Sequence, residues 1–231
     1  MLGIVRTVKK YSPVFLSILF VFSCVSFPIV VSNIQNDILS PVVLLRNDHG
    51  SGSAVCFARV NGWTYALTAS HVVYHPFQPN IPKLEVVIWD YGLKTKKRIV
   101  AADVVNSFAH SDLAIIRFKD DRVPLAKLNF EFNVGECVFA VGCPYGMPPL
   151  ICHGNIARKV LTVRYPTQTV LDILCINSSI HPGMSGGGVF KADTHELIGI
   201  ISIRFYRDDA FGGIIPLSYI RTYLEEKQWL K

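Results

Sequence analysis

The sequence predicts an all-β fold, and three observations support this prediction. Half of the 231 residues are hydrophobic and only 17% are charged, which is the composition of a folded chain rather than a disordered one. Strand-forming residues are abundant, whereas long stretches with helical periodicity are rare. Short apolar runs follow one another with turn signals between them. A chain of this length suits one large domain or two small ones that share a core.

The apolar runs fall into two sets, separated by a loop around residues 120–124. The strands expected in the first set are 41–45, 54–60, 63–68, 84–91, 98–105 and 112–118. The strands expected in the second set are 137–142, 159–165, 169–176, 187–190 and 196–205. Two sets of about six strands predict either two barrels or a pair of sandwiches.

The chain closes with a segment, residues 216–231, that is expected to form an amphipathic helix. Pro216 suits the first position of a helix, where its missing N–H has no partner to lose. Leu217, Ile220 and Leu224 form an apolar stripe at helical spacing.

The N-terminal region, residues 1–33, differs from the rest of the chain. After a basic start, residues 12–32 contain no charged side chain, and about 20 such residues cross a bilayer. A membrane anchor is one interpretation. A cleaved signal peptide is another, since Val30 and Ser32 are small enough for a cleavage site. A bacterial lipoprotein site at Cys24 is the third. All three export the remaining chain, and the missing polar face disfavours a buried core helix.

The formal charge of +6 does not indicate nucleic-acid binding. Three of the cations, Arg6, Lys9 and Lys10, precede any acidic residue, which leaves +3 (6 − 3) for the chain beyond Asn33. No block of Lys and Arg is interleaved with aromatic residues, and the short basic run at 94–98 is typical of a solvated loop.

The six cysteines do not form a metal-binding pattern, because no two are spaced as CxxC. Most of them have apolar neighbours, so we expect small buried side chains rather than ligands. Export would permit disulfides, whose pairing the sequence leaves open.

Three residues in the order His, Asp, Ser suggest acyl-transfer chemistry. His71 follows a predicted strand, Asp112 opens an otherwise apolar strand, and Ser185 lies in the stretch HPGMSGGGVF. Each has a structural explanation of its own: a structural histidine, a strand-capping aspartate, a glycine turn. Together they supply a nucleophile, a base that works near neutral pH and an acid to orient the base. A buried carboxylate is also costly unless it is paired.

The chain resembles trypsin-like serine proteases, and within them the exported HtrA/Deg type. The resemblance rests on LTASHVV around His71, SDLAIIRF around Asp112, HPGMSGGGVF around Ser185 and VGCPYGMPPLICHGN at 141–155. It implies two six-stranded antiparallel barrels at 34–125 and 126–231, with a short closing helix. A chain that ends after that helix would lack the PDZ module common in this type.

The resemblance also implies roles for individual residues. His71, Asp112 and Ser185 would form the triad, and the backbone N–H groups of Gly183 and Ser185 would bind the oxyanion. Met184 stands where the family often has Asn, which puts the packing of this loop in question. The side chains expected to line the pocket for the residue before the cut are Ser179, Ser202, Ile203 and Arg204. With no carboxylate at the floor, a small or medium apolar side chain is the expected preference.

The expected function is a serine endopeptidase that needs no metal or organic cofactor and acts on exported or membrane-proximal proteins. Its expected partners are protein or peptide substrates and, through residues 1–33, the membrane; the sequence leaves homo-oligomerisation open. Two alternatives remain at this point. One is a catalytically silent protein that keeps the fold and binds peptides. The other is a viral or phage processing protease of the same fold.

Overall fold

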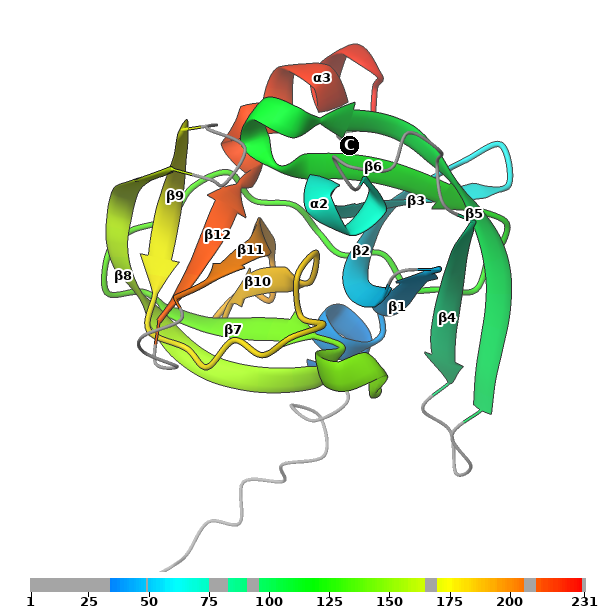
Figure 1. Ribbon diagram of the computed structural model, residues 1–231, viewed down its shortest axis with the longest axis horizontal. Helices are drawn as coiled ribbons and strands as arrows, with labels where there is room; N and C mark the ends of the chain where they lie inside the picture. The colour runs from blue at the N-terminus through cyan, green and yellow to red at the C-terminus, as the bar shows by residue number, and fades with distance from the viewer. Residues whose placement is uncertain are drawn as a thin grey trace, which may run out of the picture.

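The fold consists of two closed, antiparallel, six-stranded barrels packed side by side (Figure 1). The computed structural model describes residues 34–48, 50–74, 83–90, 96–164, 170–205 and 211–229. The prediction of an all-β fold with two such barrels is confirmed. The expected membrane segment, residues 12–32, lies outside the described residues. Within the described ranges, no helix has both the length and the apolar character that crossing a bilayer requires.

The first barrel has the strand order β1-β2-β3-β6-β5-β4. Its strands are β1 (Val42–Asn47), β2 (Gly50–Val60), β3 (Trp63–Ala69), β4 (Leu84–Asp90), β5 (Lys96–Phe108) and β6 (Leu113–Phe118). Alternate residues of one strand serve two cores, because successive side chains point to opposite faces. In β1, Val43 and Leu45 pack inside the barrel, whereas Val42 and Leu44 join a cluster shared with the second barrel.

The second barrel has the strand order β10-β11-β12-β9-β8-β7. Its strands are β7 (Cys137–Gly142), β8 (Leu150–Arg164), β9 (Val170–Ile176), β10 (Gly188–Lys191), β11 (Leu197–Arg204) and β12 (Gly212–Pro216). The apolar runs alone locate β7, β9, β10 and β11. They miss the first half of β8, which contains Cys, His, Gly and Asn, and the short β12, which begins with two glycines.

The C-terminal helix is shorter than the sequence predicts. Pro216 is the last residue of β12 and has an extended ψ of 145°, so it does not begin a helix. A 3-10 turn, η4 (Leu217–Ile220), follows, and the α-helix α3 covers only Arg221–Glu226. The prediction for Pro216 is wrong by one position, because its extended backbone ends β12 and the helical residues begin at Leu217.

The two barrels share one apolar core. This cluster includes Val55, Leu113, Val141 and Phe190, and it joins strands of both barrels. Aromatic rings extend this core toward the C-terminal region. Trp229 packs against Phe57 and Tyr65 of the first barrel and against Tyr223 of α3. The segment before β1, η1 (Gln35–Leu39), adds the fully buried Ile38. The shared core fixes the two barrels against each other, and residues from both can therefore build one site.

Candidate active site

His71 lies on a one-turn helix, α2 (Ser70–Val73), that follows β3 directly. Figure 1 shows α2 between the two barrels. The sequence predicts that His71 follows a strand, and the structure has a single helical turn at that point. Val73 is buried on its far side and anchors α2 to the first barrel.

Asp112 connects η2 (Ala109–Ser111) to β6 and has a left-handed backbone with φ of 50°. Few residues other than glycine adopt this conformation, and aspartate is among those that do so most readily. The carbonyl of Asp112 accepts a hydrogen bond of 2.9 Å from the N–H of Ser70. Asp112 thus precedes the apolar strand instead of occupying its first position, and its backbone is bound to α2.

The carboxylate of Asp112 holds the imidazole of His71. Nδ1 of His71 lies 2.8 Å from Oδ2 and 3.0 Å from Oδ1, and the backbone N–H of His71 donates to Oδ1 at 3.0 Å. The Asp112 side chain is 7% exposed and that of His71 is 36% exposed. Because an ionised carboxylate only accepts, Nδ1 carries the hydrogen and Nε2 is left to take up a proton.

A second side chain meets the same carboxylate, from the second barrel. Ser202 of β11 is buried, and its hydroxyl donates a short hydrogen bond to Oδ2 of Asp112. The sequence assigns Ser202 to the substrate pocket. In the structure its hydroxyl is bound to Asp112, which gives this buried carboxylate three donors.

The loop that carries Ser185 packs against the strands that lead to His71. The N–H of Ser53 donates to the carbonyl of Ser185 at 2.7 Å. A β-carbon on Gly52 would lie 2.6 Å from the side chain of Val72, next to His71, and 3.0 Å from the carbonyl of Ser185. A β-carbon on Gly186 would overlap the carbonyl of Ser53 and the hydroxyl of Thr68. Ser185 therefore lies beside the end of β3 and the start of α2.

Both peptide groups that flank Gly183 have fixed orientations. The carbonyl of Pro182 accepts from the N–H of Tyr145 at 2.8 Å, and that of Gly183 accepts from the hydroxyl of Ser53 at 2.8 Å. In a trans peptide the C=O and N–H point in opposite directions. The N–H of Gly183 therefore points away from Tyr145. Among the described residues, no backbone carbonyl accepts from the N–H of Gly183 or of Ser185.

Ser53 is a site residue that the sequence analysis missed. Its side chain is fully buried, and its hydroxyl accepts from the N–H of Cys143 at 2.8 Å while donating to the carbonyl of Gly183. The hydroxyl of Thr68 in turn donates to the carbonyl of Ser53 at 2.7 Å. The only signal in the sequence is the glycine-flanked stretch GSGS, which is also typical of an ordinary turn.

Met184 takes the position where Asn is frequent in the family, and its side chain is fully buried in the core of the second barrel. The N–H of Met184 donates to the carbonyl of His181 at 3.0 Å, which closes the turn just before Ser185. Burial of this long apolar side chain stabilises the loop, and the turn closes with methionine at this position.

The other residues that the sequence assigns to the substrate pocket differ in exposure. Ser179 is exposed, whereas Ile203 and Arg204 are half-buried. Ile180 is buried and lies against Gly212, where a β-carbon would overlap its side chain. Ile203 approaches the position of a β-carbon on Gly213 to 3.3 Å. Isoleucine side chains thus fill the space that the two glycines of β12 leave open.

The described cysteines are free thiols, and Cys56 and Cys143 are buried. Burial raises the pKa of the Cys143 thiol to about 12, so this side chain is neutral beside the Ser185 loop. Across the described ranges, no three His, Cys, Asp or Glu side chains group in a way that could hold a metal ion.

A model of the trypsin-like peptidase domain matches residues 51–200, which contain His71, Asp112 and Ser185. The chain belongs to the trypsin-like peptidase family. The resemblance to this family that the sequence indicates is therefore confirmed.

Curated relatives of this trypsin-like peptidase are of the HtrA/Deg type. The chain is 30% identical over 190 residues to the serine protease Do-like HtrA of Bacillus subtilis, covering 78% of this chain and 39% of the relative. It is 29% identical over 152 residues to a probable periplasmic serine endoprotease DegP-like of Hahella chejuensis, covering 65% of this chain and 29% of the relative. The chain thus spans well under half the length of these relatives.

Solved structures of similar fold include the MamO protease domain of Magnetospirillum magneticum, with a TM-score of 0.67, 20% identity, and coverage of 82% of this chain and 98% of that one. A serine endoprotease from Yersinia pestis has a TM-score of 0.63 and 24% identity, with coverage of 85% and 65%. At these identities the likeness concerns the fold of this trypsin-like peptidase.

Proposed function

We propose that this chain is a serine endopeptidase in which Ser185 is the nucleophile, His71 the general base and Asp112 the residue that orients the base. The observation that carries the proposal is the carboxylate of Asp112 at 2.8 Å from Nδ1 of His71. This contact leaves Nε2 as the proton acceptor beside the loop of Ser185. The family and its HtrA-type relatives support the same chemistry.

The reaction follows from these positions. Oγ of Ser185 attacks the carbonyl carbon of the scissile bond while its proton passes to Nε2 of His71. The negative charge that develops on the carbonyl oxygen receives hydrogen bonds from the N–H groups of Gly183 and Ser185. His71 then gives its proton to the departing amine, and the acyl group remains on Ser185. Water, deprotonated by His71, hydrolyses this ester and restores the enzyme.

The pocket for the residue before the cut is proposed to accept a small or medium apolar side chain. The residues proposed to border it are Ser179, Ser202, Ile203 and Arg204, with the side chain of Ile180 filling part of its depth against Gly212. Removal of apolar surface from water favours such a substrate by about 0.8 kcal/mol for each buried methylene group.

The chain is proposed to act outside the cytoplasm on exported or membrane-proximal proteins. The support is the uncharged segment 12–32, together with relatives whose names describe probable periplasmic endoproteases. In this proposal, residues 1–33 anchor the chain or export it. The unit 34–125 contributes His71 and Asp112, and the unit 126–231 contributes Ser185.

The test is hydrolysis of casein and of quenched fluorescent peptides by the purified chain. The expected result is turnover in the wild type and a loss of at least about 10³-fold in Ser185→Ala, His71→Ala and Asp112→Asn. Peptide binding without turnover by a folded wild type would reject the enzyme and favour a silent peptide-binding protein.

A further inference from the structure

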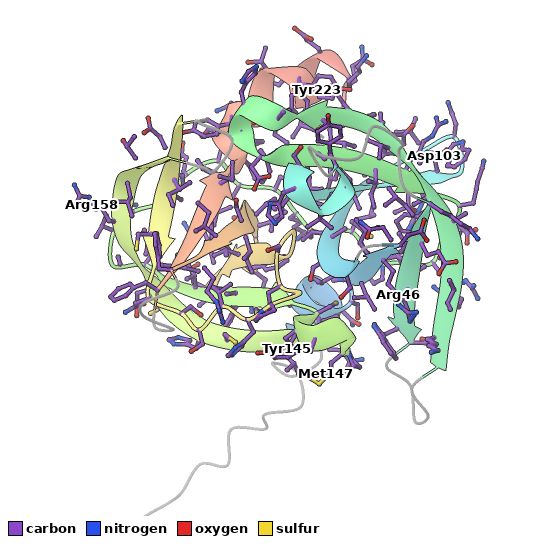
Figure 2. All side chains as sticks on the ribbon, in the orientation of Figure 1. Arg46, Asp103, Tyr145, Met147, Arg158 and Tyr223 are labelled. Atoms are coloured by element: carbon purple, nitrogen blue, oxygen red, sulfur yellow. The ribbon has the colours of Figure 1, made fainter. Side chains whose placement is uncertain are left out.

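Two large apolar side chains lie exposed on the turn between β7 and β8. Tyr145 belongs to the 3-10 turn η3 (Pro144–Gly146) and is 66% exposed, and Met147 is 44% exposed. Figure 2 labels both side chains close together at the edge of the molecule, where this turn protrudes. Exposed apolar side chains that cluster on a surface often mark an interaction site.

Backbone contacts restrain this turn although its side chains are exposed. Tyr145 has a left-handed φ of 53°, a conformation that costs energy for a large side chain and often occurs at functional sites. The N–H of Met147 donates to the carbonyl of Pro144 at 2.9 Å, and Pro148 and Pro149 restrict the chain that follows. The ring of Tyr145 lies 6.2 Å from that of His181, centroid to centroid. The exposed pair is thus held ready in one arrangement, which reduces the entropy that binding would cost.

The turn also adjoins the site of bond cleavage. The N–H of Tyr145 donates to Pro182, the residue before Gly183. Gly146 lies against the start of β2, where a β-carbon would come within 3.9 Å of the hydroxyl of Ser51. Gly52, the next residue of β2, approaches the carbonyl of Ser185. The turn η3, which carries Tyr145 and is followed by Met147, therefore lies between the residues just before Gly183 and the start of β2.

The opposite side of this loop belongs to β11. The N–H of Gly186 donates to the carbonyl of Ile201 at 2.7 Å. In the proposed function, β11 borders the pocket for the residue before the cut. A substrate that passes over Ser185 with that residue at β11 leaves the site over the start of β2 and over η3. The first residue after the cut then comes to Tyr145 and Met147.

We propose that Tyr145 and Met147 bind the substrate residue that follows the scissile bond and select an apolar or aromatic side chain there. The proposal rests on the proposed function. It assigns a specificity to the departing half of the substrate, separate from the pocket bordered by Ile203 and Arg204.

The acyl-enzyme gives direct access to this position, since the departing half has left and an added amine can take its place. The amine nitrogen attacks the acyl carbon and a C–N bond forms. The bond between that carbon and Oγ of Ser185 breaks, and the amine proton passes through His71 to Oγ. Competition between water and amino acid amides therefore measures what the position prefers.

The first experiment uses a p-nitrophenyl ester of an N-acylated alanine to form the acyl-enzyme and compares leucinamide and phenylalaninamide with glycinamide as acceptors. The wild type is expected to use leucinamide and phenylalaninamide at least about tenfold better than glycinamide. In Tyr145→Ala and in Met147→Ala, the ratio of apolar amide use to glycinamide use is expected to fall to within about threefold of one. Because each ratio compares two amides used by the same variant, a change in that variant's overall rate does not alter the ratio. Tyr219→Ala, which removes an exposed tyrosine of η4, is the matched control and should keep the wild-type ratio. Equal use of all amides by the wild type, or an unchanged ratio in both site variants, would overturn the proposal.

A second experiment does not depend on turnover. The Ser185→Ala variant is mixed with fluorescent peptide amides whose first residue is Leu, Phe or Gly. These peptides mimic the half of the substrate that departs after cleavage, and fluorescence anisotropy gives their affinities. The expected result is at least about tenfold tighter binding of the Leu and Phe peptides, lost when Tyr145→Ala is added. Equal affinities would reject the subsite. Absence of nitrophenol release in the first experiment would instead reject the proposed enzyme, while this binding measurement still decides on the subsite.

Discussion

The hydroxyl of Ser202 in the second barrel donates a hydrogen bond to the carboxylate of Asp112 in the first. The bond joins the residue that orients His71 to β11, the strand that also supports the Ser185 loop through Ile201. The relative position of base and nucleophile thus depends on a side-chain contact across the interface between the barrels as well as on apolar packing.

Ser202→Ala should lower kcat/KM by about 10- to 100-fold, because a hydrogen bond to a charged group contributes about 1.5 to 3 kcal/mol and 1.4 kcal/mol corresponds to tenfold in rate. Peptide hydrolysis measures this effect. Ser178→Ala is the matched control, since that serine is also buried and its hydroxyl has no hydrogen-bond partner within the described part of the chain. A loss of the same size in both variants would show that general destabilisation is responsible.

Ser53→Ala should reduce kcat more than it changes KM. The substitution frees the carbonyl of Gly183 and the N–H of Cys143, which the hydroxyl now joins. The peptide groups around Gly183 can then rotate, and a misaligned oxyanion donor costs about 10²- to 10³-fold in turnover. Steady-state kinetics at saturating peptide separates the two constants. A rise in KM with unchanged kcat would contradict the role assigned to Ser53.

Gly183→Ala should abolish most activity without unfolding the chain. Gly183 has φ of 92°, and an added β-carbon would lie 2.7 Å from the carbonyl of Cys143 and 2.9 Å from the N of Tyr145. Relief of these contacts displaces the N–H that the oxyanion needs. Gly135→Ala is the control, because Gly135 has φ of 90° and open space around it. Thermal melting of both variants measures how much each substitution lowers the stability of the fold. Equal peptidase activities of Gly183→Ala and Gly135→Ala would argue against an oxyanion donor at Gly183.

Cys143 should resist iodoacetamide in the folded chain at pH 9, whereas the exposed Cys137 reacts. Burial raises the pKa of Cys143 from 9.0 to about 12, so at pH 9 its thiol remains protonated where an ordinary thiol is half ionised. Unfolding in urea restores the ordinary pKa and should make both residues reactive. Mass spectrometry of the alkylated peptides reads the outcome. Modification of Cys143 before unfolding would contradict its burial beside the Ser185 loop.

The sequence predicts the strands of the first barrel well, because each is a short apolar run between turn residues. It predicts less of the second barrel. The first half of β8 mixes polar and apolar residues, and β12 begins with Gly212 and Gly213, so neither has the pattern of an isolated strand. Their strand conformation depends on pairing with strands that are distant in sequence, and the local residue pattern does not contain this information.

The candidate triad is predictable from local context, since His71, Asp112 and Ser185 each lie in a distinctive stretch. Ser53 and Tyr145 are not predictable in this way. Their importance arises from contacts with Gly183 and Pro182 that span 130 and 37 residues of sequence, respectively. A serine between glycines and a tyrosine in a Pro/Gly-rich loop have common structural explanations, and only the folded chain shows what they contact.

The central claim is that His71 activates Ser185, and a fluorophosphonate probe tests it most directly, because the probe reacts covalently with an activated serine. The purified chain would be labelled beside Ser185→Ala and His71→Ala, and the modified peptide located by mass spectrometry. If His71 activates Ser185, we expect a single adduct on Ser185 in the wild type and no adduct in either variant. An unlabelled but folded wild type, or equal labelling of His71→Ala, would contradict it.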